Sequence, residues 1–274
     1  MQSVLFRSAS AAVVALALAG CTSDLDGSGI ARPTSSTSTR TVATTSAPAT
    51  HSSSSATHPP ATTSTTTPAP ALAGLPLPYS TGDATQVITV TATSASSTTA
   101  TLRVWQKSGG GWHELGSPLF AHIGSAGMTT HPSEDLDAAP IGSYTLTQAF
   151  GALANPGTSL PYRRTDLADW WISEWPNPLY NTLQHCASSC AFTSGEPNEH
   201  LRTITPQYNY AVVIDYNTRN SPTGVHDGAG SAFFLHVTDG TATAGCVAIP
   251  QENLATILKW LSPSAHPRIL IGVT

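Results

Sequence analysis

A histidine and a cysteine lie ten positions apart in the stretch SAFFLHVTDGTATAGCVAIP, residues 231–250. His236 is near the end of one apolar, strand-like run, and Cys246 comes just before a second one. A thiol becomes a useful nucleophile when a neighbouring base or cation favours the thiolate. We expect a turn around Gly240 to fold the chain back, hairpin-like, and to bring the imidazole to the sulfur. Such a pair has the chemistry of a thiol acyltransferase.

Gly245 directly precedes the cysteine. A residue without a side chain lets a substrate carbonyl approach the backbone beside the nucleophile. We therefore expect the amide N–H groups of Gly245 and Cys246 to act as oxyanion donors, which makes Gly245 part of the predicted catalytic group.

The chain has four cysteines, and one of them stands at the end of an export signal. Arg7 supplies a positive start, a short apolar stretch follows, and Leu18-Ala19-Gly20-Cys21 resembles a bacterial lipobox. We expect residues 1–20 to be a lipoprotein signal peptide and Cys21 to carry the lipid. An ordinary secretory signal with a chance cysteine is the alternative.

Three cysteines then remain on the export side of the membrane, where unpaired thiols tend to oxidise. We expect Cys186 and Cys190, which share a short Ser-rich loop, to form a local disulfide and to leave Cys246 free. The alternative pairs one of them with Cys246, which would make that cysteine structural.

Composition divides the chain into a tether and a folded domain. Residues 21–73 consist almost entirely of Ser, Thr, Ala, Pro and Gly, and cannot bury enough apolar area to offset their ordering entropy. We expect this part to be a disordered tether. Residues 79–274 are expected to form one folded domain.

Alternating apolar positions predict several strands in this domain, for example QVITVTA and TATLRVWQK near its start and PRILIGV at its end. GSYTLTQAFG, NYAVVIDYN and SAFFLHV are further strand candidates. PQENLATILKWLSP carries apolar residues at helical spacing between two prolines and predicts a helix. The expected fold class is mostly β with short helices.

Several motifs resemble the catalytic domain of YkuD-type L,D-transpeptidases. The family's pattern of a histidine, a loop and then Ser/Thr-x-Gly-Cys is matched by His236 and Thr243-Ala244-Gly245-Cys246, and its TP-x-G-x-[FY] element is similar to residues 139–144. An actinobacterial branch is resembled at PYR, YNT, EHL, YAVVIDYN and HPRI, so that the likeness covers roughly residues 86–273.

The resemblance implies a β-sandwich-like fold and a peptidoglycan L,D-transpeptidase. Cys246, as a thiolate paired with His236, would attack a stem tetrapeptide at the L-centre of diaminopimelate, expel D-Ala and pass the acyl group to an amine of a second stem. Water as acceptor would make the enzyme an L,D-carboxypeptidase. Carbapenem-type β-lactams would acylate the same sulfur. The protein would work in the cell envelope, anchored by lipid to the outer face of the cytoplasmic membrane.

Five further residues are candidates for substrate binding on the same resemblance: Tyr180, Asn181, His200, Thr243 and Ala244. The family often has Ser-His-Gly-Cys, and Ala244 stands where that second histidine would be. His200 would supply this histidine if its loop folded over the cysteine; the alternative is a helix or turn residue with no catalytic role. The loss also motivates a rival hypothesis, a non-catalytic domain that only binds peptidoglycan. A cysteine peptidase of another family is a third.

The net charge and the absence of certain motifs argue against several other functional classes of protein. The formal net charge is −5 and only 10% of residues are charged, which argues against nucleic acid as a partner. The sequence has no Gly-rich phosphate loop after a strand, no HExxH and no paired-cysteine zinc spacing. We therefore expect neither a cofactor nor a metal.

Overall fold

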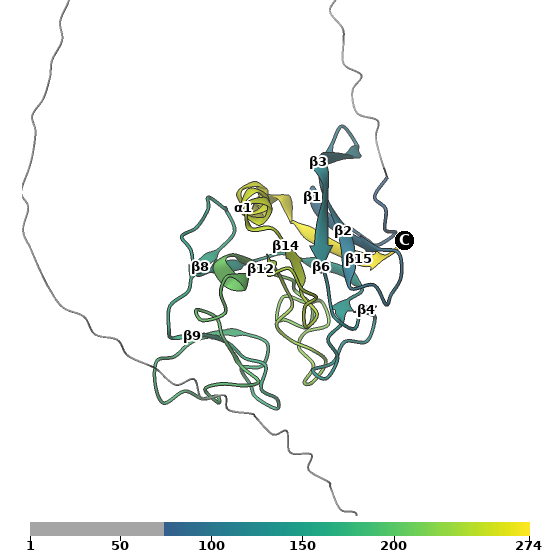
Figure 1. The fold of residues 1–274 in the computed structure, drawn as a ribbon. Helices are drawn as coiled ribbons and strands as arrows, with labels where there is room; N and C mark the ends of the chain where they lie inside the picture. Colours follow the sequence, from purple (N-terminus) through teal and green to yellow (C-terminus); the bar gives the residue numbers. More distant parts are fainter. Residues whose placement is uncertain (1–73) are drawn as a thin grey trace, which may run out of the picture. The chain divides into compact units, whose positions relative to one another are not determined.

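The structure is a computed structural model that describes residues 74–274 (Figure 1). The strands are β1 (Gln86–Ala92), β2 (Thr99–Ser108), β3 (Gly111–His122), β4 (Met128–Thr129), β5 (Ala139–Pro140), β6 (Gly142–Thr145), β7 (Ala149–Gly151), β8 (Tyr162–Arg164), β9 (Asp169–Trp171), β10 (Leu183–His185), β11 (Glu199–His200), β12 (Ala211–Val213), β13 (Phe234–Val237), β14 (Val247–Ile249) and β15 (Arg268–Val273). The helices are α1 (Gln251–Trp260) and two short 3₁₀ turns, η1 (Gln207–Asn209) and η2 (Pro263–Ala265). The mostly-β prediction with short helices is confirmed.

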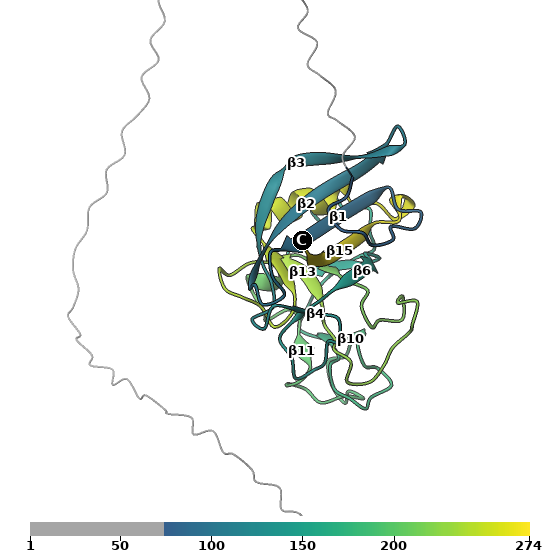
Figure 2. The ribbon, with the colours of Figure 1, turned by 90° about the vertical axis from the view of Figure 1, so that its right-hand side faces the viewer.

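Ten of the strands form one mixed sheet in the order β6-β15-β1-β2-β3-β14-β13-β12-β7-β8. Although β6 is an edge strand and β7 lies at the other end of this order, only residues 146–148 connect them. So short a connection requires the sheet to curl so that β6 comes near β7. Figure 2 shows β3, β2, β1, β15 and β6 following one another along one side of the molecule. A backbone hydrogen bond across the gap agrees, because Asp215 N, just after β12, donates to the carbonyl oxygen of Thr145 in β6.

The curl explains why one predicted strand is divided in two. GSYTLTQAFG is expected to be continuous, but β6 pairs with β15 while β7 pairs with β12 and β8. Local alternation of side chains cannot show that a strand changes partners part of the way along.

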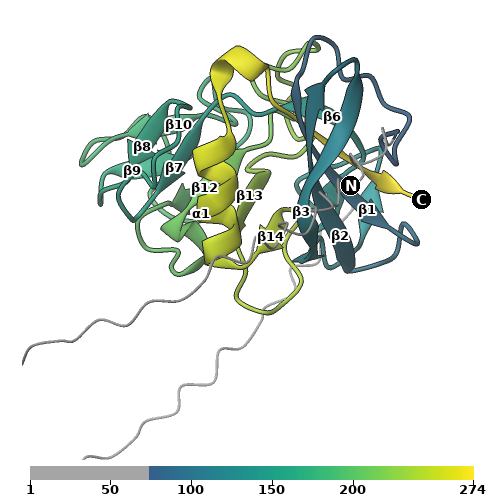
Figure 3. The same cartoon turned by 90° about the horizontal axis from the view of Figure 1, so that it is seen from above.

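The helix α1 follows the sequence pattern closely. In α1 the apolar positions Leu254, Ile257 and Leu258 are all buried, as the helical spacing predicts. Figure 3 shows this helix lying across the central strands, with β12, β13 and β14 beneath it. Packing also begins slightly before the predicted domain start at residue 79, since Leu77 already packs with Trp105 and Leu270.

β13, which carries His236, and β14, which begins just after Cys246, run parallel, so the hairpin-like arrangement expected from the sequence is wrong. Leu235 pairs with Val247 and His236 pairs with Ala248, both in parallel register. The connecting loop, residues 238–246, therefore returns along the strand before β14 begins. Gly124 and Thr243 form a parallel bridge that ties this loop to the segment after β3.

Alternation along β13 and β14 gives the centre of the sheet two buried faces. Leu235, Val237, Val247 and Ile249 pack in the main core with side chains of α1, β1 and β2. The two halves of the curled sheet thus face each other across this core in a sandwich-like layering. On the opposite face, Phe234 and Cys246 join a second cluster with Phe150, Trp171, Leu201 and Tyr208.

The predicted signal peptide at residues 1–20, the lipid-bearing Cys21 and the tether at residues 21–73 lie outside the described residues. Within residues 74–274 no helix has both the length and the apolar character needed to cross a bilayer.

Candidate active site

His236 is held in one orientation by its own strand. Its side chain is 7% exposed, and its Nδ1 lies 2.8 Å from the carbonyl oxygen of Val237. A carbonyl only accepts hydrogen bonds, so Nδ1 carries the proton and Nε2 is the basic nitrogen. Burial lowers the pKa of His236 below its usual value, which keeps the imidazole neutral and able to accept a proton.

Cys246 is the residue just before β14, and it lies beside Phe234 of β13, on the same face of the sheet as His236. The Cα atoms of diagonal neighbours on adjacent strands are about 8 Å apart, a separation that an imidazole and a thiol side chain together can bridge. The sulfur accepts the Phe234 N–H at 3.3 Å and donates to the Ala232 carbonyl at 3.2 Å. It is free, as predicted, and 8% exposed.

The resting pair is a thiol beside a neutral imidazole rather than the thiolate that the resemblance implies. Burial raises the pKa of Cys246 far above its usual value, and the nearby Glu199 carboxyl adds to the rise. Ionisation of the sulfur therefore has to accompany proton transfer to a base when a substrate is present.

Both side chains open onto a cavity of about 470 Å³. Among the described residues that line it, five are acidic and none is Lys or Arg. The lining residues are Ser133, Glu134, Leu136, Asp137, Ser173, Glu196, Pro197, Glu199, Ile204, Gln207, Tyr208, Ser231, Ala232, Phe233, His236, Asp239, Thr241, Ala242, Thr243, Ala244 and Cys246. This is the size of pocket that small molecules and peptide side chains occupy.

Two of the lining residues, Glu199 and Tyr208, form a pair that the sequence gives no sign of. The Tyr208 hydroxyl donates to Glu199 Oε2 at 2.6 Å, and the Tyr208 ring meets the His236 ring edge-on with centroids 5.6 Å apart. Burial raises the pKa of Glu199 to about 7, against the opposing effect of the Tyr208 hydrogen bond.

Thr243 and Ala244, both predicted to bind substrate, do line the cavity. The Thr243 hydroxyl also shapes the turn before the nucleophile, since Oγ1 donates to the Cys246 carbonyl at 2.7 Å and accepts the Gly245 N–H at 3.1 Å. The expected oxyanion role of the Gly245 N–H therefore meets a competing partner inside the protein. Of the two expected donors, the Cys246 N–H is the one that we retain.

The structure gives a further reason for a glycine at position 245. Its φ is +124°, and a Cβ there would lie 2.7 Å from a ring carbon of Phe233 and 3.1 Å from the Ala138 carbonyl oxygen. The turn thus combines a backbone conformation that other residues rarely adopt with space for no side chain.

Gly245→Ala is expected to lower the free energy of unfolding by about 2–4 kcal/mol, from backbone strain and the contact with Phe233 together. Gly240→Ala is the matched control, because Gly240 also has a positive φ, +93°, but open space around it. Its expected cost is about 1 kcal/mol. Urea unfolding of both variants gives the difference; equal costs would show that the contact with Phe233 does not matter.

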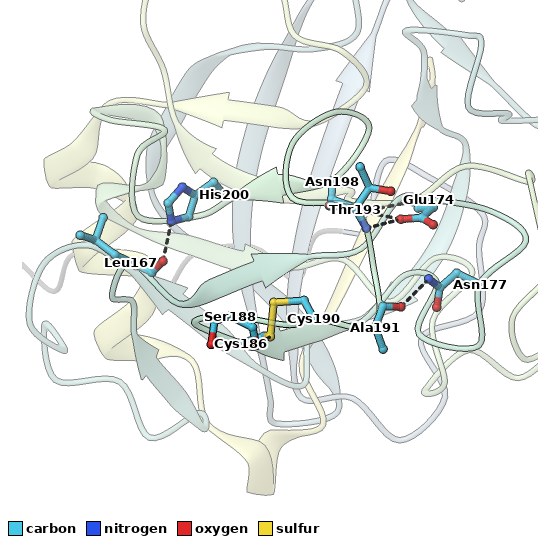
Figure 4. The surroundings of a disulfide bond; sticks show 10 residues. All are labelled: Leu167, Glu174, Asn177, Cys186, Ser188, Cys190, Ala191, Thr193, Asn198 and His200. Carbon is cyan, nitrogen blue, oxygen red and sulfur yellow. Dashed lines mark hydrogen bonds between the residues drawn. A yellow bond between two sulfur atoms is a disulfide. The ribbon is translucent and has the colours of Figure 1, made fainter.

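Tyr180, Asn181 and His200, the other predicted substrate-binding residues, are not among those that line the cavity. Tyr180 is buried and its hydroxyl donates to the carboxylate of Glu134, which does line it. His200 stacks on Trp170 with centroids 4.3 Å apart and bonds the Leu167 carbonyl through Nε2, so it does not replace the missing second histidine (Figure 4).

Asn181 contacts the nucleophile indirectly, through the backbone of Ala232. Its Oδ1 accepts the indole N–H of Trp171 at 2.8 Å and the N–H of Ala232 at 3.1 Å, while Nδ2 donates to two backbone carbonyls. Ala232 is the residue whose carbonyl accepts the Cys246 thiol. Asn181 therefore positions the backbone against which the sulfur rests.

The local disulfide between Cys186 and Cys190 is present, with Cα atoms 5.7 Å apart (Figure 4). Near it, Asp166, Asp169 and His185 are the one group in the described part of the chain that is close enough to share a metal ion. Arg163 already fills this position, because its Nε and Nη2 donate to the two Asp169 oxygens at 2.9 and 2.8 Å. The cluster is explained by that ion pair.

Comparisons of this chain with protein-family models, with curated proteins and with solved structures found no match.

Proposed function

We propose that this protein is a cysteine-dependent acyltransferase of the YkuD type, an L,D-transpeptidase that acts on the stem peptides of peptidoglycan. The observation that carries the proposal is that a free thiol and a basic imidazole nitrogen lie on the same face of the sheet and line the same cavity. The sequence motifs that resemble the family centre on these same two residues.

In the first step, Cys246 Sγ attacks the carbonyl carbon at the L-centre of diaminopimelate in a donor tetrapeptide. The thiol proton passes to His236 Nε2, whose partner nitrogen stays bonded to Val237 O. A tetrahedral adduct forms, and the peptide bond to the terminal D-Ala breaks. The leaving amine takes the proton from the imidazolium, which leaves a thioester on Cys246 and a neutral His236.

In the second step, the amine of an acceptor stem attacks the thioester and loses its proton to His236. The C–S bond breaks, the sulfur recovers the proton, and the product is a diaminopimelate-to-diaminopimelate cross-link. Water in place of the amine gives the trimmed tripeptide. Neither route calls for a metal or an organic cofactor.

The anchor belongs to the same proposal. A lipid on Cys21 and a tether over residues 21–73 would hold the domain at the outer face of the cytoplasmic membrane, where stem peptides are within reach.

A non-catalytic peptidoglycan-binding domain is the second candidate. The observation that favours it is the composition of the cavity wall, where His236 is the only histidine among the described lining residues and Ala244 takes the place of the other. The two candidates differ in whether a covalent bond to substrate forms.

Product analysis on disaccharide-tetrapeptides tests the proposal. Release of D-Ala together with a cross-linked dimer is expected from a transpeptidase, and D-Ala with tripeptide from a carboxypeptidase. Unchanged substrate that is nevertheless retained by the protein would favour the binding domain. Cleavage at other peptide bonds would instead indicate a cysteine peptidase of another kind.

A further inference from the structure

Glu199 is a half-buried carboxyl that the proposed reaction does not use. It belongs to β11, which pairs with β9 so that Glu199 lies opposite Trp171, and its side chain reaches the wall of the cavity. Within the described residues its hydrogen-bond partner is the Tyr208 hydroxyl, and none of the salt bridges includes it. Among residues 74–274, no cation is paired with a carboxylate held there.

The groups that face Glu199 are acidic or neutral on every side. Glu196 lies just before it on the chain and Glu134 comes from the loop that follows β4, and both raise the pKa of the Glu199 carboxyl. Tyr208 faces it from η1, while Cys246, just before β14, and His236 of β13 share its cavity. The charge of Glu199 also bears on the sulfur, because it contributes to the raised pKa of Cys246.

The position of Glu199 is fixed from behind by the preceding residue. Asn198 Oδ1 accepts the N–H groups of Ser173 and Glu174, each at 2.8 Å, and Asn198 Nδ2 donates to Thr193 O at 2.8 Å. Figure 4 shows Asn198 with Glu174 and Thr193, near the disulfide between Cys186 and Cys190. Such a network fixes the segment from which the Glu199 side chain projects.

Tyr208 links Glu199 to the catalytic pair. Its ring packs edge-on against His236, and against Phe150 and Phe234 with centroids 5.5 Å away in each case. The hydroxyl bond to Glu199 holds the outer end of this ring in place. The chain of contacts therefore runs from Glu199 through Tyr208 to the imidazole.

We propose that Glu199 is a positioning residue of the Cys246–His236 pair, which acts through Tyr208 and has to carry its proton for the sulfur to ionise readily. The inference rests on the proposed use of Cys246 as the nucleophile. A protonated Glu199 keeps the cavity neutral while negative charge forms on the sulfur. An ionised Glu199 places a second negative charge in the same low-dielectric space and opposes the thiolate.

The ionisations of Glu199 and Cys246 each oppose the other, so the reactivity of Cys246 should depend on the charge of Glu199. Because the Glu199 pKa is raised to about 7, its charge appears as the pH rises through neutrality. The ionisation of Cys246 should then be suppressed in the wild type at alkaline pH, but not in Glu199→Gln. Glutamine keeps an acceptor for the Tyr208 hydroxyl and cannot ionise.

The experiment measures the rate of alkylation of Cys246 by iodoacetamide from acid to alkaline pH, in the full chain with its disulfide intact. Well below neutral pH, Glu199→Gln and the wild type are expected to react at equal rates. Above neutrality the variant should react faster by roughly ten-fold, the effect of one pKa unit on the thiolate fraction. A ratio of the two rates that stays constant with pH would overturn the proposal.

Two further variants separate the effect of the Tyr208 hydrogen bond and of the Glu199 charge from that of other carboxyl groups. Tyr208→Phe keeps the ring against His236 but removes the hydroxyl donor. Because the hydroxyl bond lowers the Glu199 pKa, its loss should raise that pKa, and the suppression should begin at higher pH. Glu252→Gln removes an exposed carboxyl on α1 and should leave the wild-type profile unchanged. The ultraviolet absorbance of the thiolate, taken as the difference from Cys246→Ala, titrates the sulfur directly where alkylation is slow.

These measurements need no stem peptide, so they stand apart from the test of the proposed function. A pH-dependent ratio with no action on tetrapeptides would retain the coupling and reject the substrate. A constant ratio in a protein that forms cross-links would reject only the role of Glu199.

Discussion

Replacing Cys246 with alanine is expected to abolish covalent modification of the protein by a carbapenem. The proposed reaction makes this sulfur the atom that opens the β-lactam ring, and alanine has no nucleophile to offer. Intact-mass spectrometry should show one carbapenem adduct on the wild type and none on the variant. The same substitution is expected to remove all release of D-Ala from tetrapeptides.

The fold should tolerate this substitution, since alanine keeps the β-carbon in the cluster with Phe234 and Tyr208. We expect a loss of stability of only about 1 kcal/mol, comparable to the removal of one small buried group. The matched control replaces both Cys186 and Cys190 with alanine, because their disulfide does not line the cavity. That variant should lose stability and keep the adduct. An adduct that survives in Cys246→Ala would assign the acylation to another residue.

Replacing His236 with alanine is expected to slow acylation of Cys246 by about 10²–10⁴-fold, the usual contribution of a positioned general base. The cause is the raised pKa of the buried thiol, which leaves almost no thiolate unless a base accepts the proton. Stopped-flow or quenched measurements of carbapenem acylation give the rate. Circular dichroism checks that the variant remains folded.

The pH dependence of acylation in the wild type is a second test of the role of His236 as the base. A neutral imidazole is required, and burial lowers its pKa below 6.5, so acylation should persist to slightly acidic pH before it falls. His122→Ala is the control, since His122 bonds Thr238 Oγ1 at 2.9 Å and does not line the cavity. Equal rates in His236→Ala and His122→Ala would remove His236 from the mechanism.

Local patterns in the sequence were sufficient for the elements that depend on nearest neighbours. The helical spacing of Leu254, Ile257 and Leu258 identifies the buried face of α1, and alternation identifies β1, β2 and β15. The free thiol also follows from the short separation of Cys186 and Cys190, which favours a local disulfide.

Features that depend on distant partners could not be predicted in this way. Nothing in residues 231–250 shows that β13 and β14 run parallel, because the pairing is set by the bridge to Gly124 and by the curl of the whole sheet. The pair of Glu199 and Tyr208 was missed for a similar reason. Each residue looks ordinary alone, and their proximity to Cys246 arises only when β11 and η1 close over the same face.

The predicted substrate-binding residues show where motif resemblance is least informative. Asn181 is the kind of residue that a cleft would use, yet all of its hydrogen-bonding groups are satisfied by Trp171, Ala232 and two carbonyls inside the protein. A short amide side chain serves equally well in a buried turn or in a pocket, and its type does not distinguish the two.

The most direct test of the central claim is the mass of the protein during turnover of a tetrapeptide donor. The proposed mechanism predicts a transient adduct equal to the stem peptide without its terminal D-Ala, located on Cys246 by peptide mapping and released by hydroxylamine as a thioester. Consumption of the donor with the sulfur of Cys246 unmodified throughout would contradict it.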